Sequence, residues 1–154
     1  MTALIWDKTG EHVYETGVNN GVLYKYDKTT KNYKNGVAWN GLTTVTMSPE
    51  GAESNAVYAD NIKYLDLISA EEMKFTIEAV TYPDEFAECD GTASIAEGVF
   101  IGQQERAKFA FSYKTKVGND QDSEAGYKLH IVYNATAAPS ERAYATVSDS
   151  PEAI

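Results

Sequence analysis

The chain has 154 residues, of which 43% are apolar and 12% aromatic, a composition typical of one globular domain that buries its own core. Its 13 basic and 23 acidic residues give a net charge of −10, which argues against a protein that grips nucleic acid through phosphate contacts. No apolar run approaches the roughly 18 residues of a membrane span, the N-terminus lacks the pattern of a secretion signal, and the single cysteine excludes an internal disulfide and suits a reducing compartment.

The acidic residues are concentrated in the middle of the chain. Thirteen of them lie between Glu50 and Glu105, where Lys63 and Lys74 are the only lysines. Such a segment keeps a domain soluble, and it also suits a surface along which nucleic acid slides without binding. The sequence leaves both interpretations open.

The first predicted elements are short. Met1–Asp7 contains three large apolar side chains without a lasting period, so it is either an N-terminal arm that packs on a partner or a frayed end. His12–Gly17 and Val22–Asp27 are predicted to be two strands of a tight hairpin, because the Asn-Gly pair between them tolerates positive φ.

Four lysines follow in a turn-rich segment, and their spread favours a solvated edge or a counter-charge for the acidic face of a partner over a polyanion site. They are Lys25, Lys28, Lys31 and Lys34.

The stretch Val37–Ile68 is predicted to be a strand, a polar loop and a second strand. Val37–Met47 alternates apolar and polar residues with Leu42 as the exception, which is typical of a half-buried strand. Ser48–Asn55 has no large apolar side chain and contains a proline and a glycine, so we expect strand pairing to stop there. Two strands of about ten residues would reach roughly 33 Å. The stretch is either an ordinary hairpin with a loose loop or an arm that docks on a neighbouring subunit.

The next elements are a strand and a helix. Met73–Ala79 alternates, so Met73, Phe75 and Ile77 are predicted to be core residues, with Glu72, Lys74, Thr76 and Glu78 turned outward. Pro83–Cys89 has a proline and acids in its first turn and is the one convincing helix.

The last third of the chain is mainly strand. Thr92–Gln104 is predicted to be irregular. Arg106–Lys116 and Tyr127–Tyr133 alternate strongly and are expected to pair as antiparallel neighbours, and Glu141–Val147 is expected to be a final short strand.

The sequence contains no arrangement typical of catalysis, so we expect neither an enzyme nor a cofactor. His12 and His130 are far apart, and His130 shares a strand face with Lys128, which predicts a solvated histidine. There is no phosphate-binding glycine loop, no HExxH, no CxxC and no nucleophile elbow. Acids at Asp84, Glu85 and Glu88 fit a helix N-terminus better than a metal site.

Several long segments resemble the major tail protein of siphophages that infect Gram-positive bacteria. The resemblance extends over almost the whole chain, and its segments are long and ungapped. They are Tyr33–Leu42, Ser48–Asn61, Glu78–Gly91, Ile101–Gln104, Phe109–Lys116, Tyr127–His130 and Pro139–Tyr144.

The resemblance implies a tail-tube fold: a β-sandwich or barrel with one short α-helix and a long protruding β-hairpin loop. By this resemblance, residues 1–154 would form one domain, with an N-terminal arm at 1–10, a stacking loop at 43–60 and a C-terminal arm at 148–154. Members of the family usually continue into a further strand, so the C-terminal arm would be truncated at Ile154 unless the chain is a natural short form.

The implied function is structural. Six subunits would form a ring around a channel for DNA, and rings would stack into a tube in the virion after assembly in the host cytoplasm. Other copies of the chain would be the main partner, with tape-measure, tail-terminator and distal tail proteins besides; DNA would pass without specific binding, and no membrane is involved.

The resemblance also implies residues for each role. The inter-ring stacking loop would contain Met47, Ser48, Pro49, Glu50, Gly51, Ala52, Glu53, Ser54, Asn55 and Tyr58. The channel would be lined by Glu72, Lys74 and Glu78, with Asp60 and Asp66 as further candidates.

A second class of function is open on strand content alone. A monomeric Ig-like or carbohydrate-binding β-sandwich would show the same number of alternating strands. The oligomeric state distinguishes it from a tube protein.

Overall fold

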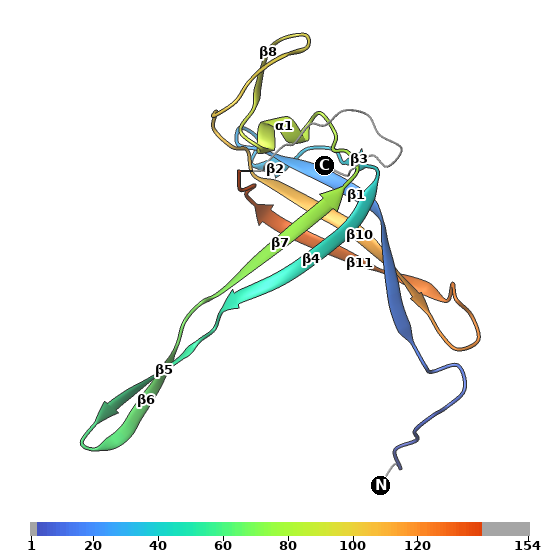
Figure 1. Ribbon diagram of the computed structural model, residues 1–154, viewed down its shortest axis with the longest axis vertical. Coiled ribbons are helices and arrows are strands. Elements are labelled where there is room, and N and C mark those ends of the chain that lie inside the picture. The colour runs from blue at the N-terminus through green and yellow to red at the C-terminus, as the bar shows by residue number, and fades with distance from the viewer. Residues whose placement is uncertain (1–2, 140–154) are drawn as a thin grey trace, which may run out of the picture. The chain divides into compact units, whose positions relative to one another are not determined.

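The fold is that of a computed structural model, which describes residues 3–139 (Figure 1). The chain divides into two compact units, one with the residues up to Thr43 and from Glu78 onward, the other with residues 44–77. Strands dominate both units, and the described residues contain one short helix. The prediction of a mainly β fold with one short α-helix is therefore confirmed.

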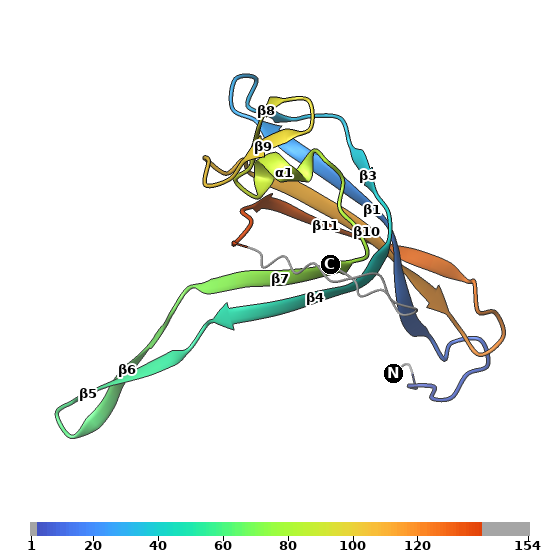
Figure 2. The same ribbon diagram turned by 45° about the horizontal axis from the view of Figure 1, so that its top comes forward.

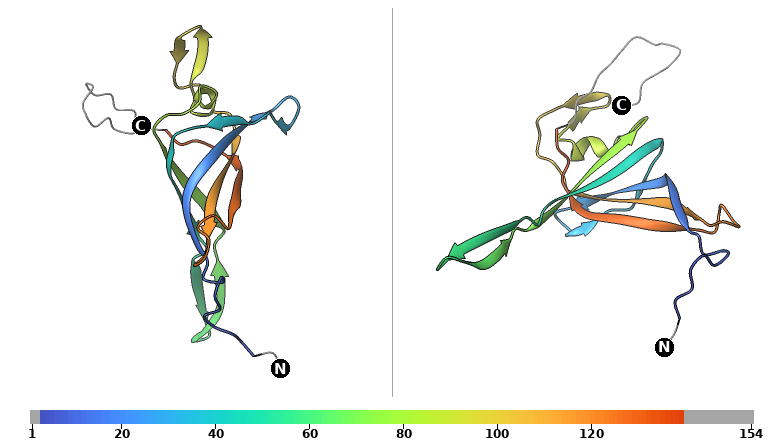
Figure 3. Two further views of the ribbon diagram at one scale, coloured as in Figure 1. Left: turned by 90° about the vertical axis from the view of Figure 1, so that its right-hand side faces the viewer. Right: turned by 60° about the horizontal axis from the view of Figure 1, so that its bottom comes forward.

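The first unit is built around an antiparallel sheet of five strands. The order is β11 (Gly126–Ala135), β10 (Phe109–Gly118), β1 (Tyr14–Asp27) and β2 (Asn32–Tyr33), and β3 (Val37–Trp39) also pairs with β1. Figure 2 shows β10 between β1 and β11. The strands twist, and the sheet curls into half of a barrel (Figure 3).

β1 is one continuous strand, so the hairpin predicted between residues 12 and 27 is wrong. Both halves of β1 pair with β10, and two irregularities on either side of Asn19 absorb the mismatch in register. Gly17 and Asn20 have φ of +72° and +50°, so their tolerance of positive φ serves bulges inside the strand instead of a turn. Pairing along the whole of β10 overrides the local turn preference.

β10 and β11 are antiparallel partners, as their alternation predicts. Lys116 lies opposite Tyr127, Lys114 opposite Leu129, and Ser112 opposite Ile131. Directly opposite residues in an antiparallel pair share one face. We call the face that carries Lys114, Lys116, Tyr127, Leu129 and Ile131 the open face of β10–β11.

The core lies on the other face of the sheet. Phe109, Phe111 and Tyr113 project from β10 and are almost fully buried. The ring of Trp39 packs against them, with its centroid 5.4 Å from that of Phe111 and 4.9 Å from that of Phe86. Such aromatic contacts contribute about 0.5–1.5 kcal/mol each beyond burial.

The helix α1 (Phe86–Cys89) is shorter than the predicted helix Pro83–Cys89. The amide of Phe86 donates to the carbonyl of Pro83 at 2.9 Å, and that of Ala87 donates to Asp84 at 3.1 Å. These i to i+3 bonds make a tight entry turn instead of an α-helical one. Phe86 and Cys89 face the core, with Cys89 fully buried.

The region 92–104, predicted to be irregular, contains a hairpin formed by β8 (Ala93–Ala96) and β9 (Val99–Ile101) (Figure 2). Its register leaves Ile95 without an opposite residue. The bulge breaks the period of two, which is why alternation does not reveal these strands.

The ends of the chain carry predictions with different outcomes. Residues 3–10 form no strand, and Leu4, Ile5 and Trp6 are exposed, which leaves a partner-binding arm and a frayed end both open. The predicted strand Glu141–Val147 and the C-terminal arm at 148–154 lie outside the described residues.

The second unit consists of two successive strand pairs (Figure 1). β4 (Leu42–Gly51) pairs with β7 (Glu71–Ala79), and β5 (Ser54–Ala59) pairs with β6 (Ile62–Ile68). No residue from 44 to 77 is buried. The predicted strand Val37–Met47 is split, because a break at residues 40–41 precedes β4 and explains why Leu42 does not fit the alternation.

Candidate functional site: an apolar hairpin

The hairpin of β5 and β6 ends in a two-residue turn at Asp60 and Asn61. Both residues have positive φ, +51° and +62°, and Ala59 lies opposite Ile62. Positive φ at both central positions is the geometry of a type I′ turn, whose twist matches that of the flanking strands. Asp and Asn tolerate this region better than other non-glycine residues.

This turn lies beyond the segment that the sequence analysis assigned to the loop. Ser48–Gly51 belong to β4, and Ser54 and Asn55 begin β5. The predicted eight-residue loop Ser48–Asn55 is therefore wrong. Pro49 fits within β4 because, among the strands of residues 3–139, β4 pairs with β7 alone, so one edge of the strand needs no backbone donor.

The two strand pairs meet at a corner formed by residues 51–53 and 69–70. Gly51 has φ of +92° and Ala52 of +53°. The amide of Glu53 donates to the Ser69 hydroxyl at 2.9 Å, and the amide of Ser69 donates to the Glu53 carbonyl at 3.0 Å. These bonds carry the pairing through the corner.

One face of the β5–β6 pair is apolar. Val57 lies opposite Leu65, and Leu67 and Ile62 lie opposite Asn55 and Ala59. A register shift between Val57 and Tyr58 leaves Tyr64 without an opposite residue and keeps Ile62 on this face. We call Val57, Ile62, Leu65 and Leu67 the apolar hairpin face.

These side chains are not covered within the hairpin. Val57 and Leu65 are 39% and 38% exposed, and Leu67 and Ile62 are 58% and 62% exposed. Tyr58, a predicted stacking residue, is 72% exposed. A ribbon of two strands has no second layer of its own, so its apolar side chains stay in contact with water.

Two local ion pairs lie in the second unit. Lys63 contacts Asp66 at 2.7 Å, and Lys74 contacts Glu50 at 2.5 Å across β4 and β7. The hydrogen bond to Glu50 raises the pKa of Lys74. These exposed pairs contribute little stability each.

The structure separates the residues predicted to line a channel. Asp60 and Asp66 lie in the β5–β6 hairpin, whereas Glu72, Lys74 and Glu78 lie on β7. β6 pairs with β5 and β7 pairs with β4, so Asp60 and Asp66 do not lie on a strand next to β7. The turn at Asp60–Asn61 closes the β5–β6 pair locally.

The alternation of β7 is confirmed near its C-terminal end only. Phe75 and Ile77 are half-buried and Ala79 is buried, whereas Lys74, Thr76 and Glu78 are exposed. Met73 is 55% exposed, so its prediction as a core residue is wrong. A two-stranded ribbon gives it no covering layer.

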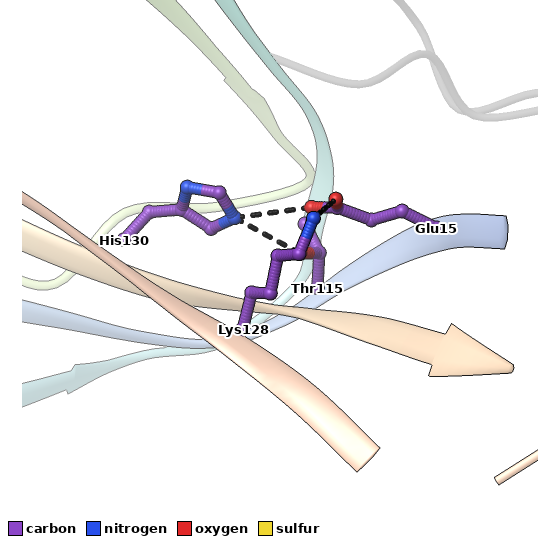
Figure 4. A network of polar contacts seen from close by, with 4 residues as sticks. All are labelled: Glu15, Thr115, Lys128 and His130. Carbon is purple, nitrogen blue, oxygen red and sulfur yellow. Dashed lines mark hydrogen bonds and ion pairs between the residues drawn. The ribbon is translucent and has the colours of Figure 1, made fainter. Parts of the chain in front are cut away.

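A polar network joins β1, β10 and β11 in the first unit (Figure 4). Lys128 donates to Glu15 Oε2 at 2.6 Å, and the hydroxyl of Thr115 donates to Glu15 Oε1. His130 Nε2 lies 3.2 Å from Glu15 Oε1 and 2.9 Å from Thr115 Oγ1. The hydrogen bonds from Lys128 and Thr115 lower the pKa of Glu15 to about 2.

This network corrects the prediction of a solvated His130. The imidazole stacks on Tyr113 with centroids 4.8 Å apart and is half-buried. Glu15 and Thr115 both contact the same nitrogen, so the carboxylate does not orient the ring from its other nitrogen as a hydrolytic relay requires. The geometry is that of a structural link between three strands.

The lysine-rich segment is partly neutralised by the chain itself. Lys25 contacts Glu88 at 2.6 Å, and Lys28 pairs with Glu105. A hydrogen bond from the Thr29 amide lowers the pKa of Asp27, and the positive charge of Lys34 lowers it further. Carboxylates of the same chain therefore neutralise part of the positive charge that was predicted to face a partner.

Comparison with protein-family models, with curated proteins and with solved structures gave no match. Within residues 3–139, no group of three or more His, Cys, Asp or Glu side chains is placed to hold a metal ion. The part of the chain that the structure describes has no helix with the length and hydropathy of a membrane span.

Two features were not predicted from the sequence. Glu15 carries no motif, and its role depends on Lys128 and His130, which are more than a hundred residues away in sequence. The turn at Asp60–Asn61 had a signal, because Asp-Asn between two apolar runs favours a two-residue hairpin.

Proposed function

We propose that this chain is the structural subunit of a phage tail tube, which forms hexameric rings that stack around a negatively charged channel for DNA. The resemblance of long segments to siphophage major tail proteins supports the proposal. So does the excess of acidic residues, because a negative wall lets DNA pass without binding.

The observation that carries the proposal is the exposure of the second unit. Nine large apolar side chains are exposed between residues 44 and 77, although the strands there are fully paired with one another. Exposed apolar side chains that gather in one part of a soluble protein are typical of an interaction site. The nine exposed side chains are Met47, Val57, Tyr58, Ile62, Tyr64, Leu65, Leu67, Ile68 and Met73.

The partner that fits a tube is another copy of the same chain. Ten residues, Met47 to Asn55 and Tyr58, were expected to make the inter-ring contact, and we extend that surface to the whole of the second unit, because the hairpin continues to Asp60–Asn61. Tape-measure, tail-terminator and distal tail proteins would bind the ends of the tube in the virion.

The oligomeric state tests the proposal. Sedimentation and negative-stain microscopy of the purified chain over a wide concentration range should show rings or tubes. A matched variant in which a two-residue turn replaces residues 53–69 should stay folded and lose stacking, because no residue removed is buried. A wild-type chain that remains a monomer at every concentration would favour the alternative, a monomeric β-sandwich binding module.

A further inference from the structure

The open face of β10–β11 is a second exposed apolar surface, in the first unit. Tyr127, Leu129 and Ile131 are 65%, 54% and 45% exposed and alternate along one face of β11. β11 is the last strand of the described sheet, with β10 as its only neighbour. Exposed apolar residues that gather on one face of a strand are typical of a surface that binds a partner.

The charge of these two strands is unusual for this chain. β10 and β11 carry Lys114, Lys116 and Lys128 and no carboxylate, although the whole chain has a net charge of −10. Lys114 and Lys116 lie on the open face; Lys114 Nζ is 4.3 Å from the centroid of the Tyr127 ring, and Lys116 contacts Glu124 at 2.8 Å. The open face is therefore apolar with a positive rim.

The second unit has the opposite charge around a similar apolar surface. Residues 44–77 contain six carboxylates and two lysines. The apolar hairpin face consists of aliphatic side chains, and the acids Glu53 and Asp60 flank β5 at its two ends. Asp66 projects from the other face of the hairpin and pairs with Lys63. Both surfaces are apolar, and the charges around them are opposite.

We propose that the apolar hairpin face of one copy docks on the open face of β10–β11 of a second copy. The contact rests on the proposed function and names the surface that receives the hairpin. Because two different patches meet, the contact is heterologous, so each copy offers one free hairpin and one free face, and association continues from copy to copy. Carboxylates beside the apolar hairpin face would meet Lys114 at the rim, which steers association and fixes its register.

Two double variants test the two sides of the contact separately. The hairpin variant carries Ile62→Ser and Leu67→Ser, and the face variant carries Leu129→Ser and Ile131→Ser. All four side chains are at least 45% exposed, so we expect both variants to fold, which circular dichroism checks. The control removes the same kind of surface elsewhere, with Ile95→Ser and Val99→Ser in the β8–β9 hairpin.

The decisive measurement is the mass of the variants alone and mixed, by sedimentation. Each variant alone should stop at the mass of a single ring where the wild type stacks further, because truncation of central apolar residues raises the concentration required for stacking about tenfold or more. An equimolar mixture of the rings of the two variants should form pairs of rings, since the hairpin variant keeps an intact face and the face variant an intact hairpin. The control should assemble like the wild type.

Other results would overturn the contact. If the wild type stacks but the mixture stays at the mass of single rings, the tube proposal stands and this contact is wrong. If the hairpin variant still stacks alone, the open face pairs with itself or with another surface. A wild type that stays monomeric at every concentration would overturn both the contact and the proposed function.

The rim charge gives a second readout. Lys114→Glu should weaken wild-type assembly and remove part of its salt dependence, whereas Lys31→Glu makes the same charge change in the turn after β1 and should have a smaller effect. Equal effects of the two substitutions would mean that only net charge matters.

Discussion

A Cβ atom added to Gly51 would overlap the carbonyl oxygen of Ala70 and would lie 3.2 Å from the Cα atom of Glu71. Gly51 also has φ of +92°, a region that other residues rarely adopt. The corner between the β4–β7 pair and the β5–β6 pair therefore depends on glycine at this position.

We expect Gly51→Ala to loosen the corner without unfolding the first unit. Strain of about 1–3 kcal/mol at such a position corresponds to roughly tenfold to a hundredfold faster amide exchange in residues 53–69. Exchange in β10 should not change. Gly102→Ala is the control, because nothing lies within 4 Å of a Cβ there; equal exchange in both variants would contradict the role of Gly51.

The indole of Trp39 holds the segment after β7 to the core. Its Nε1 donates a 2.9 Å hydrogen bond to the carbonyl of Thr81, and its ring contacts Phe86 and Phe111. Trp39→Phe should lower the free energy of unfolding by about 1–3 kcal/mol, because the Thr81 carbonyl loses its donor in a part-buried site. Urea unfolding measures this loss.

Trp6 provides the control for that substitution. Its side chain is 78% exposed, so Trp6→Phe should leave stability unchanged and should make the fluorescence report on Trp39 alone. A stability loss in Trp6→Phe as large as in Trp39→Phe would mean that the hydrogen bond to Thr81 is not the cause.

The network around Glu15 makes stability depend on pH in the acid range. Because hydrogen bonds from Lys128 and Thr115 hold the pKa of Glu15 at about 2, below its usual 4.5, the folded state is favoured while the carboxylate is ionised. This stabilisation is complete above pH 4.5 and is lost as the pH falls toward 2.

Glu15→Gln should therefore reduce stability at neutral pH and flatten its decline between pH 4.5 and 2. Thermal unfolding at a series of pH values measures the slope. Glu97→Gln, in the exposed turn between β8 and β9, should leave the slope as in the wild type. Parallel curves for the wild type and Glu15→Gln would show that the network does not stabilise the fold.

Cys89 should be unreactive in the native protein. Its side chain is fully buried, and burial raises the pKa of the thiol to about 11, so almost no thiolate is present at pH 8. We expect a thiol reagent to modify the chain slowly in buffer and rapidly in concentrated urea. Fast modification of the folded chain would mean that α1 opens readily.

The proposed channel predicts an effect of charge on DNA passage. Glu72 and Glu78 are exposed on β7, so Glu72→Lys with Glu78→Lys should permit tube assembly and slow DNA ejection, because lysines give phosphates a place to bind. The control pair, Asp84→Lys with Glu97→Lys, changes the net charge equally. A tube structure with Glu72 and Glu78 on the outer wall would contradict this assignment.

Local sequence patterns predict the strand content and several of the elements correctly. The alternation in residues 106–116 and 127–133 predicts two strands and their pairing. It does not account for burial in β10, because Ala110 and Ser112 are buried along with Phe109, Phe111 and Tyr113. Acids and a proline before Phe86 predict the helix, although not its length. These features depend on neighbours within a few residues, so a single sequence contains them.

Register, turn position and side-chain partners depend instead on contacts between distant parts of the chain. The Asn-Gly pair in β1 favours a turn locally, but pairing along the whole of β10 keeps the strand continuous through two irregularities. Ser48–Asn55 is polar enough to be a loop, yet hydrogen bonds between Glu53 and Ser69 extend the pairing to a turn at Asp60–Asn61. Period and turn preference are local properties, whereas the free energy of strand pairing depends on residues far apart in the chain, and that free energy outweighs local preference here.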